Sequence, residues 1–238
     1  MSNTTNLVIS ESLAAARGRL TDALAAAGRP ADDARLLAVS KTKPAGMIRE
    51  AWLQGQRDFG ENYVQEALAK QTELRDLEDI VWHFIGPLQS NKTREVAEHF
   101  AWVHSVDREK IARRLHDQRP DELGPLNICL QVNISAEPSK SGVMLEELPK
   151  LAETVLSMPA LRLRGLMAIP APAEEASVQR EPFARLRQAL ERLRETFPEA
   201  PLDTLSMGMS ADLEAAVAEG ATLVRLGTAI FGERDRTS

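Results

Sequence analysis

Residues 36–44 read LLAVSKTKP, an apolar run followed by two lysines and a proline. The apolar run predicts a short buried strand over residues 36–40. Pro44 predicts the start of a helix, because proline is favoured at the first helical position. Lys41 would then lie at the carboxyl end of a buried strand. Partial burial there would favour the neutral amine, a nucleophile toward aldehydes, whereas the alternative is an ordinary solvated lysine on a loop.

The same order of strand and helix recurs along the whole chain. The hydrophobic pattern predicts eight strands, at residues 36–40, 58–63, 81–86, 102–106, 126–132, 163–169, 204–207 and 223–226. A helix is predicted before the first strand, at residues 10–27, and others between the strands, for example at 44–54, 63–74 and 108–118.

Alternating strands and helices imply a parallel sheet with right-handed crossovers. Eight such units favour a closed barrel over an open, doubly wound sheet, and barrels of about 250 residues are commonly single domains. We therefore predict an α/β protein, a single (β/α)8 TIM barrel with an extra N-terminal helix, and one domain over residues 1–238.

Composition argues against several function classes. The 238 residues carry a formal net charge of −6, so overall charge gives no support for a nucleic-acid or membrane-surface partner. No amino-terminal segment resembles a signal peptide, and no apolar run approaches membrane-spanning length. We therefore expect a cytoplasmic protein without a membrane partner. Cys129 is the single cysteine, which excludes an internal disulfide and predicts a buried, inert thiol.

The polar residues that could carry chemistry follow the predicted strands. In barrels of this type the functional site lies at the carboxyl ends of the strands. The candidates near these ends are Lys41, Asn62, Ser206 and Arg225. Strands one and eight are neighbours in a closed barrel, so Lys41 and Arg225 are expected on one side of the rim.

A phosphate site is predicted on the same side of the rim. Loops after strands seven and eight of such barrels often bind phosphate. Gly208 and Gly227 would let backbone amides approach an anion closely, and Thr228 begins a predicted short helix whose exposed amides would bind it.

A phosphorylated aldehyde would use both the amine and the phosphate site. Pyridoxal 5′-phosphate (PLP) is the obvious candidate, with Lys41 forming the internal aldimine. Arg225 would then face the pyridine nitrogen and, being permanently protonated, would leave that nitrogen unprotonated. The alternative for Arg225 is a structural ion pair near the barrel rim.

Other residues compete for these roles or have simpler explanations. Lys43 shares a face with Lys41 if the segment is extended, but it lies further out and should be more solvated, which favours Lys41. His83 and His104 lie in predicted strands and are expected to be packed and hydrogen-bonded. No metal-ligand spacing involves the four histidines.

Long segments of the chain, in order, resemble the pyridoxal phosphate homeostasis proteins, single-domain relatives of the alanine racemase barrel. These segments are AVSKTKP at 38–44, FGENYVQE at 59–66, WHFIGPLQSNK at 82–92, HSVD at 104–107, QVNIS at 131–135, KSG at 140–142, GLMAI at 165–169, SMGMSADLEAA at 206–216 and VRLGTAIFG at 224–232.

The resemblance implies a barrel like the N-terminal domain of alanine racemase, with PLP on Lys41. It further implies phosphate contacts from the Ser206 region, Gly227 and Thr228, with Arg225 at the ring nitrogen and Asn62 as an additional cofactor-binding residue. It also implies a monomer that buffers or supplies PLP, with PLP-dependent apoenzymes as recipients, and without efficient turnover.

Enzymatic alternatives remain open on the sequence. Related racemases use a tyrosine from a separate domain as a second acid/base, and here the only tyrosine is Tyr63, at a helix start. This favours a PLP-binding protein over a PLP-dependent amino-acid racemase-like enzyme, a decarboxylase or a transaminase. A Schiff-base aldolase that acts on a sugar phosphate is a third possibility.

Overall fold

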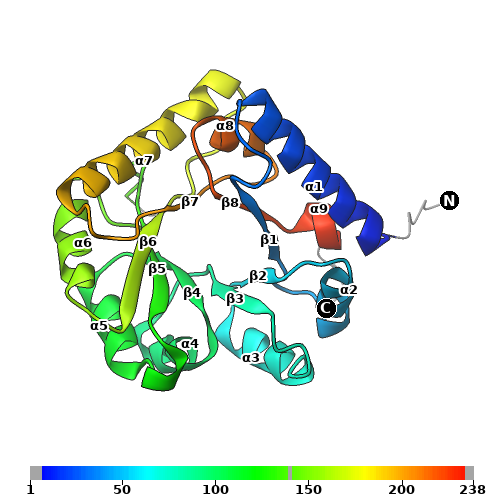
Figure 1. Cartoon of the computed structure of the whole chain (residues 1–238), viewed down its shortest axis with the longest axis horizontal. Coiled ribbons are helices and arrows are strands. Elements are labelled where there is room, and N and C mark those ends of the chain that lie inside the picture. Colours follow the sequence, from blue (N-terminus) through cyan, green and yellow to red (C-terminus); the bar gives the residue numbers. More distant parts are fainter. Residues whose placement is uncertain (1–6, 139–140, 234–238) are drawn as a thin grey trace.

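A computed structural model describes residues 7–138 and 141–233 of the protein. Eight parallel strands form a closed barrel in the order β1-β2-β3-β4-β5-β6-β7-β8, with the helices arranged around it (Figure 1). This confirms the predicted (β/α)8 barrel. The strands are β1 (Arg35–Val39), β2 (Asp58–Glu61), β3 (Val81–Phe84), β4 (Trp102–Val106), β5 (Leu126–Gln131), β6 (Leu161–Met167), β7 (Thr204–Ser206) and β8 (Leu223–Leu226).

The α-helices occupy the connections between the strands and both ends of the described chain. They are α1 (Ile9–Ala26), α2 (Ala45–Leu53), α3 (Val64–Glu73), α4 (Thr93–His99), α5 (Glu109–Gln118), α6 (Leu148–Leu156), α7 (Ala176–Thr196), α8 (Leu213–Ala218) and α9 (Thr228–Phe231). The polar segment KSG at 140–142 lies partly outside the described residues.

Helix α1 is the predicted extra helix before the first strand. Its apolar residues recur every three to four positions and are buried at Leu13, Ala16, Leu20 and Leu24. This face packs along α8 and α9, so α1 lies on the outside of the barrel next to the last helices (Figure 1).

Barrel closure brings the first and last strands together. Leu37 of β1 is opposite Arg225 of β8, and Val39 is opposite Gly60 of β2. The loops that follow β1, β2 and β8 therefore meet at one part of the rim.

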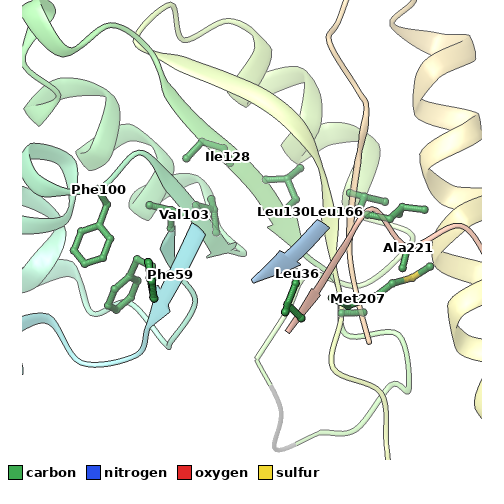
Figure 2. Packing of buried hydrophobic residues seen from close by; sticks show 14 of the residues in the cluster. Leu36, Phe59, Phe100, Val103, Ile128, Leu130, Leu166, Met207 and Ala221 are labelled. Carbon is green, nitrogen blue, oxygen red and sulfur yellow. The ribbon is translucent and has the colours of Figure 1, made fainter. Parts of the chain in front are cut away.

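Alternate residues of each strand face opposite sides of the barrel wall. Outward-facing residues such as Leu36, Phe59 and Ile128 pack in the main apolar core with the helices (Figure 2). A separate buried cluster joins Trp102, Cys129 and Met167. Cys129 is fully buried, as expected, and burial raises the pKa of its thiol to about 12.

The strand boundaries differ from prediction mainly next to the rim. Strand β1 ends at Val39, so Lys41 lies in a turn, and Pro44 is the N-cap of α2 instead of its first residue. Strand β6 begins two residues earlier than predicted because Leu161 pairs with Leu126.

Two negative findings concern the described part of the chain. None of its helices has the length and apolar character needed to cross a bilayer. The described residues also contain no group of three histidine, cysteine or acidic side chains arranged to hold a metal ion.

Candidate functional site

A cavity of about 370 Å³ opens at the carboxyl ends of the strands. Its lining comes from β1, β8 and the loops of the rim and consists of Val39, Lys41, Asn62, Ile85, Ile169, Met209, Ser210, Ala211, Arg225, Gly227 and Thr228. The fold thus brings five of the six predicted site residues to one cavity. The sixth, Ser206, is fully buried and does not line it.

The surroundings of the two lysines are the reverse of what the sequence predicts. Lys41 is exposed, while Lys43 is half-buried and donates from Nζ to the Glu233 carbonyl at 2.6 Å. The expectations of a partly buried Lys41 and a more solvated Lys43 are therefore wrong, because the left-handed φ of 65° at Thr42 turns the chain after β1. Lys41 nonetheless lines the cavity that holds Arg225, whereas Lys43 lines only a smaller adjacent pocket.

Arg225 is a buried cation on the cavity wall. Its Nη2 donates to the Ala168 carbonyl at 3.1 Å, and its Nη1 donates to Ser206 Oγ at 3.0 Å. Within the described residues it forms no ion pair with a carboxylate, so nothing there supports the alternative of a structural ion pair. Burial lowers the pKa of Arg225 to about 10, which still leaves the guanidinium charged at neutral pH.

The loops after β7 and β8, which line the same cavity, contain backbone N–H groups without acceptors among the described residues. The amides of Ser210, Ala211 and Thr228 form no hydrogen bond within the part of the chain that the structure describes. Gly208 has a φ of 101°, which glycine adopts without strain, and it turns the chain directly after β7. The loops after β7 and β8 therefore present unpaired donors where the sequence predicts a phosphate.

Asn62 is one of the polar residues that line the cavity. Its Oδ1 is buried and has no partner within the described residues, which is a costly state unless a ligand donates to it. The next loop packs closely behind Asn62, since a Cβ at Gly86 would lie 2.4 Å from the Asn62 carbonyl oxygen. Glycine at this position thus allows the contact that places Asn62 at the rim.

A buried charge cluster anchors the turn that carries Lys41. Lys70 Nζ donates to Glu61 Oε1 at 2.7 Å and to the Ser40 carbonyl at 2.7 Å, and it pairs with Glu66 at 2.8 Å. Glu66 in turn accepts from the Thr42 backbone N–H. Burial raises the pKa of Glu61, which the bond from Lys70 opposes. These contacts fix both ends of the turn around Lys41.

Ser206 belongs to a chain of hydrogen bonds that runs through the barrel interior. Its Oγ is 2.7 Å from His104 Nδ1; His104 Nε2 is 2.9 Å from His83 Nδ1; and His83 Nε2 is 2.8 Å from Asp58 Oδ1. The contact between Ser206 of β7 and His104 of β4 crosses the interior, because these strands are not neighbours. This confirms that both histidines are packed and hydrogen-bonded.

The two interior histidines predict acid destabilisation. Burial lowers the pKa of both His83 and His104 in the folded protein. The unfolded chain therefore binds more protons below the ordinary histidine pKa of about 6.5, and the free energy of unfolding falls by up to about 1.4 kcal/mol per pH unit for each histidine. Urea unfolding at pH 7.5 and 5.5 measures this loss. His104→Asn should reduce it, whereas the exposed-site control His99→Gln should retain it; equal unfolding free energies at both pH values would contradict the prediction.

Several residues of the site were not found from the sequence. Ser210 and Ala211 line the cavity, and Lys70 and Glu66 hold the Lys41 turn. The segment SMGMSA at residues 206–211, at the end of a predicted strand, could have indicated Ser210 and Ala211. The Lys70 contacts join three separate segments, for which the local sequence gives no signal.

Comparison with known proteins gives consistent results. The family model "Alanine racemase, N-terminal domain" matches residues 12–235. A protein named "Pyridoxal phosphate homeostasis protein" in Pseudomonas aeruginosa is 62% identical over 227 residues, covering 95% of this chain and 96% of that protein. An Escherichia coli protein of the same name is 55% identical over 229 residues, covering 95% and 97%. The structure of PipY from Synechococcus elongatus with PLP bound superposes with a TM-score of 0.84 at 42% identity, covering 94% of this chain and all of PipY.

Proposed function

Because this chain belongs to the pyridoxal phosphate homeostasis protein family, with the barrel of the alanine racemase N-terminal domain, we propose that it binds PLP in the rim cavity and serves in PLP homeostasis. Lys41 supplies the amine that binds the aldehyde, and Arg225 faces the ring nitrogen. The amides after β7 and β8, including those of Gly227 and Thr228, hold the phosphate. When bound, PLP supplies an aldehyde carbon for the amine and a pyridine ring that can accept electrons.

The observation that carries this proposal is the buried Arg225, which has no carboxylate partner among the described residues and lines the same cavity as Lys41. A buried cation is costly unless a ligand or protein group compensates for its lost hydration. A ring nitrogen with a free lone pair is such a group. The amides of Ser210 and Thr228, which have no acceptor among the described residues, add donors for a phosphorylated ligand, and Asn62 adds a polar side chain to the lining.

We further propose that Ser206 serves the cofactor indirectly. It lies behind Arg225 and accepts a hydrogen bond from it, so it supports the guanidinium that faces the ring. We also propose that residues 1–238 form one PLP-binding TIM-barrel domain that acts as a monomer in the cytoplasm and gives up PLP to PLP-dependent apoenzymes.

The lining of the cavity supports PLP storage without efficient turnover. Among the described residues, its lining includes one amine and one guanidinium, and no carboxylate, imidazole, thiol or phenol. Racemisation needs an acid/base on each face of the cofactor, and Lys41 can serve one face only. Arg225 does not give up its proton to the ring nitrogen, which weakens the ring as an electron sink. Tyr63, which could supply a phenol, is half exposed and lines two adjacent pockets but is not among the lining residues of this cavity.

Titration with PLP and with pyridoxal tests the site directly. PLP should produce a visible absorption band, and borohydride should reduce the C=N bond formed between Lys41 Nζ and the aldehyde carbon to a stable secondary amine on the Lys41 peptide. Pyridoxal lacks the phosphate and should bind at least about tenfold more weakly, since it loses the charge-assisted bonds to the amides. A protein that keeps no visible absorption after free PLP has been removed by desalting, or equal affinity for both compounds, would contradict the proposal.

The enzymatic alternative is tested with single enantiomers of small amino acids. We expect no sustained change in optical rotation when the PLP-loaded protein is incubated with one enantiomer. A steady loss of rotation that Lys41→Ala abolishes would establish a racemase instead. An aldolase would differ in another way, since borohydride would then trap an adduct only in the presence of a sugar phosphate.

A further inference from the structure

Behind Ser206 a row of buried, hydrogen-bonded side chains continues away from the cavity through His104 and His83 to Asp58. We propose that Asp58, His83 and His104 are positioning residues that act through Ser206 to hold Arg225 toward the cofactor ring. Each hydrogen bond between them has one fixed donor and one fixed acceptor. The inference rests on the proposed function, because it places Arg225, one end of this hydrogen-bonded row, against the PLP ring nitrogen.

The two ends of the chain determine the direction of every hydrogen bond in it. Arg225 can only donate, and its Nη1 donates to Ser206 Oγ at 3.0 Å. At the other end Asp58 accepts, because its bond from His83 keeps the pKa of its carboxyl low despite the opposing effect of burial. With both imidazoles neutral, Ser206 must donate to His104 Nδ1. His104 must then donate from Nε2 to His83, and His83 from Nε2 to Asp58.

Burial keeps the two histidines neutral. Both are fully buried, and the ring of Trp102 stacks on His83 at a centroid distance of 5.3 Å. The positive charges of Arg35 and Arg225 lie at opposite ends of the chain and both disfavour a proton on His104. The Asp58 carboxylate accepts from His83 at 2.8 Å, and its other oxygen lies 3.9 Å from Arg35. Each imidazole therefore carries one hydrogen, on Nε2.

This arrangement explains how Arg225 stays oriented without a carboxylate beside it. A direct carboxylate would pair with the guanidinium and occupy two of its donors. Ser206 instead accepts one N–H, and its own hydrogen is committed to His104, so its lone pairs remain available to Arg225. The negative charge of the chain stays at Asp58, at the opposite end from Arg225. The positive charge of Arg225 therefore remains available to a ligand in the cavity.

Nitrogen NMR of the PLP-free protein tests the proton order without any cofactor. Long-range ¹H–¹⁵N spectra distinguish the two neutral tautomers and the cation of each imidazole. We expect His83 and His104 both to show the Nε2–H tautomer at neutral pH, assigned by comparison with His83→Gln and His104→Asn. A proton on Nδ1 of either residue, alone or in a cation, would overturn the inference whether or not the protein binds PLP.

The positioning role is tested by comparing PLP-loaded variants with the PLP-loaded wild-type protein. His104→Leu removes the Nδ1 atom that accepts the hydrogen of Ser206 Oγ. It should shift the visible absorption maximum of bound PLP and weaken PLP binding about tenfold. His104→Asn keeps an acceptor at the position of Nδ1 and should restore most of both. Asp58→Leu should shift the maximum in the same direction, whereas Arg35→Gln, which removes only a 3.9 Å ion pair with Asp58, should not.

The two proposals fail in different ways. A wild-type protein that acquires no band with PLP contradicts the proposed function, and the NMR result then decides the proton order separately. A wild-type band that is unchanged in position and affinity in His104→Leu and Asp58→Leu overturns the positioning role. Lower thermal stability of these variants with an unchanged spectrum also overturns it, because this would show a structural role only.

Discussion

Lys41→Ala is expected to remove the PLP adduct from the turn after β1 and to weaken PLP binding at least about tenfold. The substitution deletes the amine of the cavity that holds Arg225. Arg225, Asn62 and the loop amides remain, so the phosphate and ring contacts should retain weaker binding. A tenfold change corresponds to about 1.4 kcal/mol, a modest estimate for the loss of a covalent bond. Titration followed by absorbance, with borohydride reduction and peptide mapping at one equivalent of PLP, measures both effects.

Lys43→Ala is the matched control for this substitution. Lys43 is two residues away, lines the smaller pocket and is already bonded to the Glu233 carbonyl. Its removal should leave the absorption band, the affinity and the modified peptide as in the wild type. An adduct of the wild-type protein that maps to Lys43, or an unchanged affinity in Lys41→Ala, would move the nucleophile away from Lys41.

The barrel could be predicted because its signals are local. Each strand is a short apolar run, each helix has its own apolar stripe, and the parallel order follows from their alternation. The rim residues could be predicted for the same reason, since the carboxyl ends of all strands meet at one side of the barrel. Lys41, Asn62 and Arg225 needed only their positions relative to the strand ends.

The contacts inside the barrel could not be predicted in the same way. Ser206 and His104 are 102 residues apart in the sequence, and the strands that carry them are not neighbours. Alternation assigns each of them to the interior face but does not choose partners across it. The exposure of Lys41 was missed because it depends on the backbone of one residue, Thr42, whose left-handed conformation is uncommon for a threonine.

Gly165→Ala is expected to have the largest effect on the fold, a loss of about 3 kcal/mol or more in the free energy of unfolding. Gly165 of β6 is opposite Thr204 of β7, and a Cβ at residue 165 would lie 1.7 Å from the Thr204 carbonyl oxygen. Real atoms do not approach so closely, so β7 must move away from β6. Since β7 carries Ser206, PLP binding should weaken as well. Urea unfolding and PLP titration measure the two losses.

The control for this substitution is Gly18→Ala, in the exposed part of α1. Nothing lies within 4 Å of a Cβ at residue 18, so alanine there should raise the free energy of unfolding by about 0.5–1 kcal/mol through its higher helix propensity. Opposite signs for the same chemical change would show that the cost at residue 165 comes from its neighbour. Because that neighbour is backbone, a smaller side chain at residue 204 should not rescue Gly165→Ala. Rescue by Thr204→Ala would contradict the contact of residue 165 with the β7 main chain.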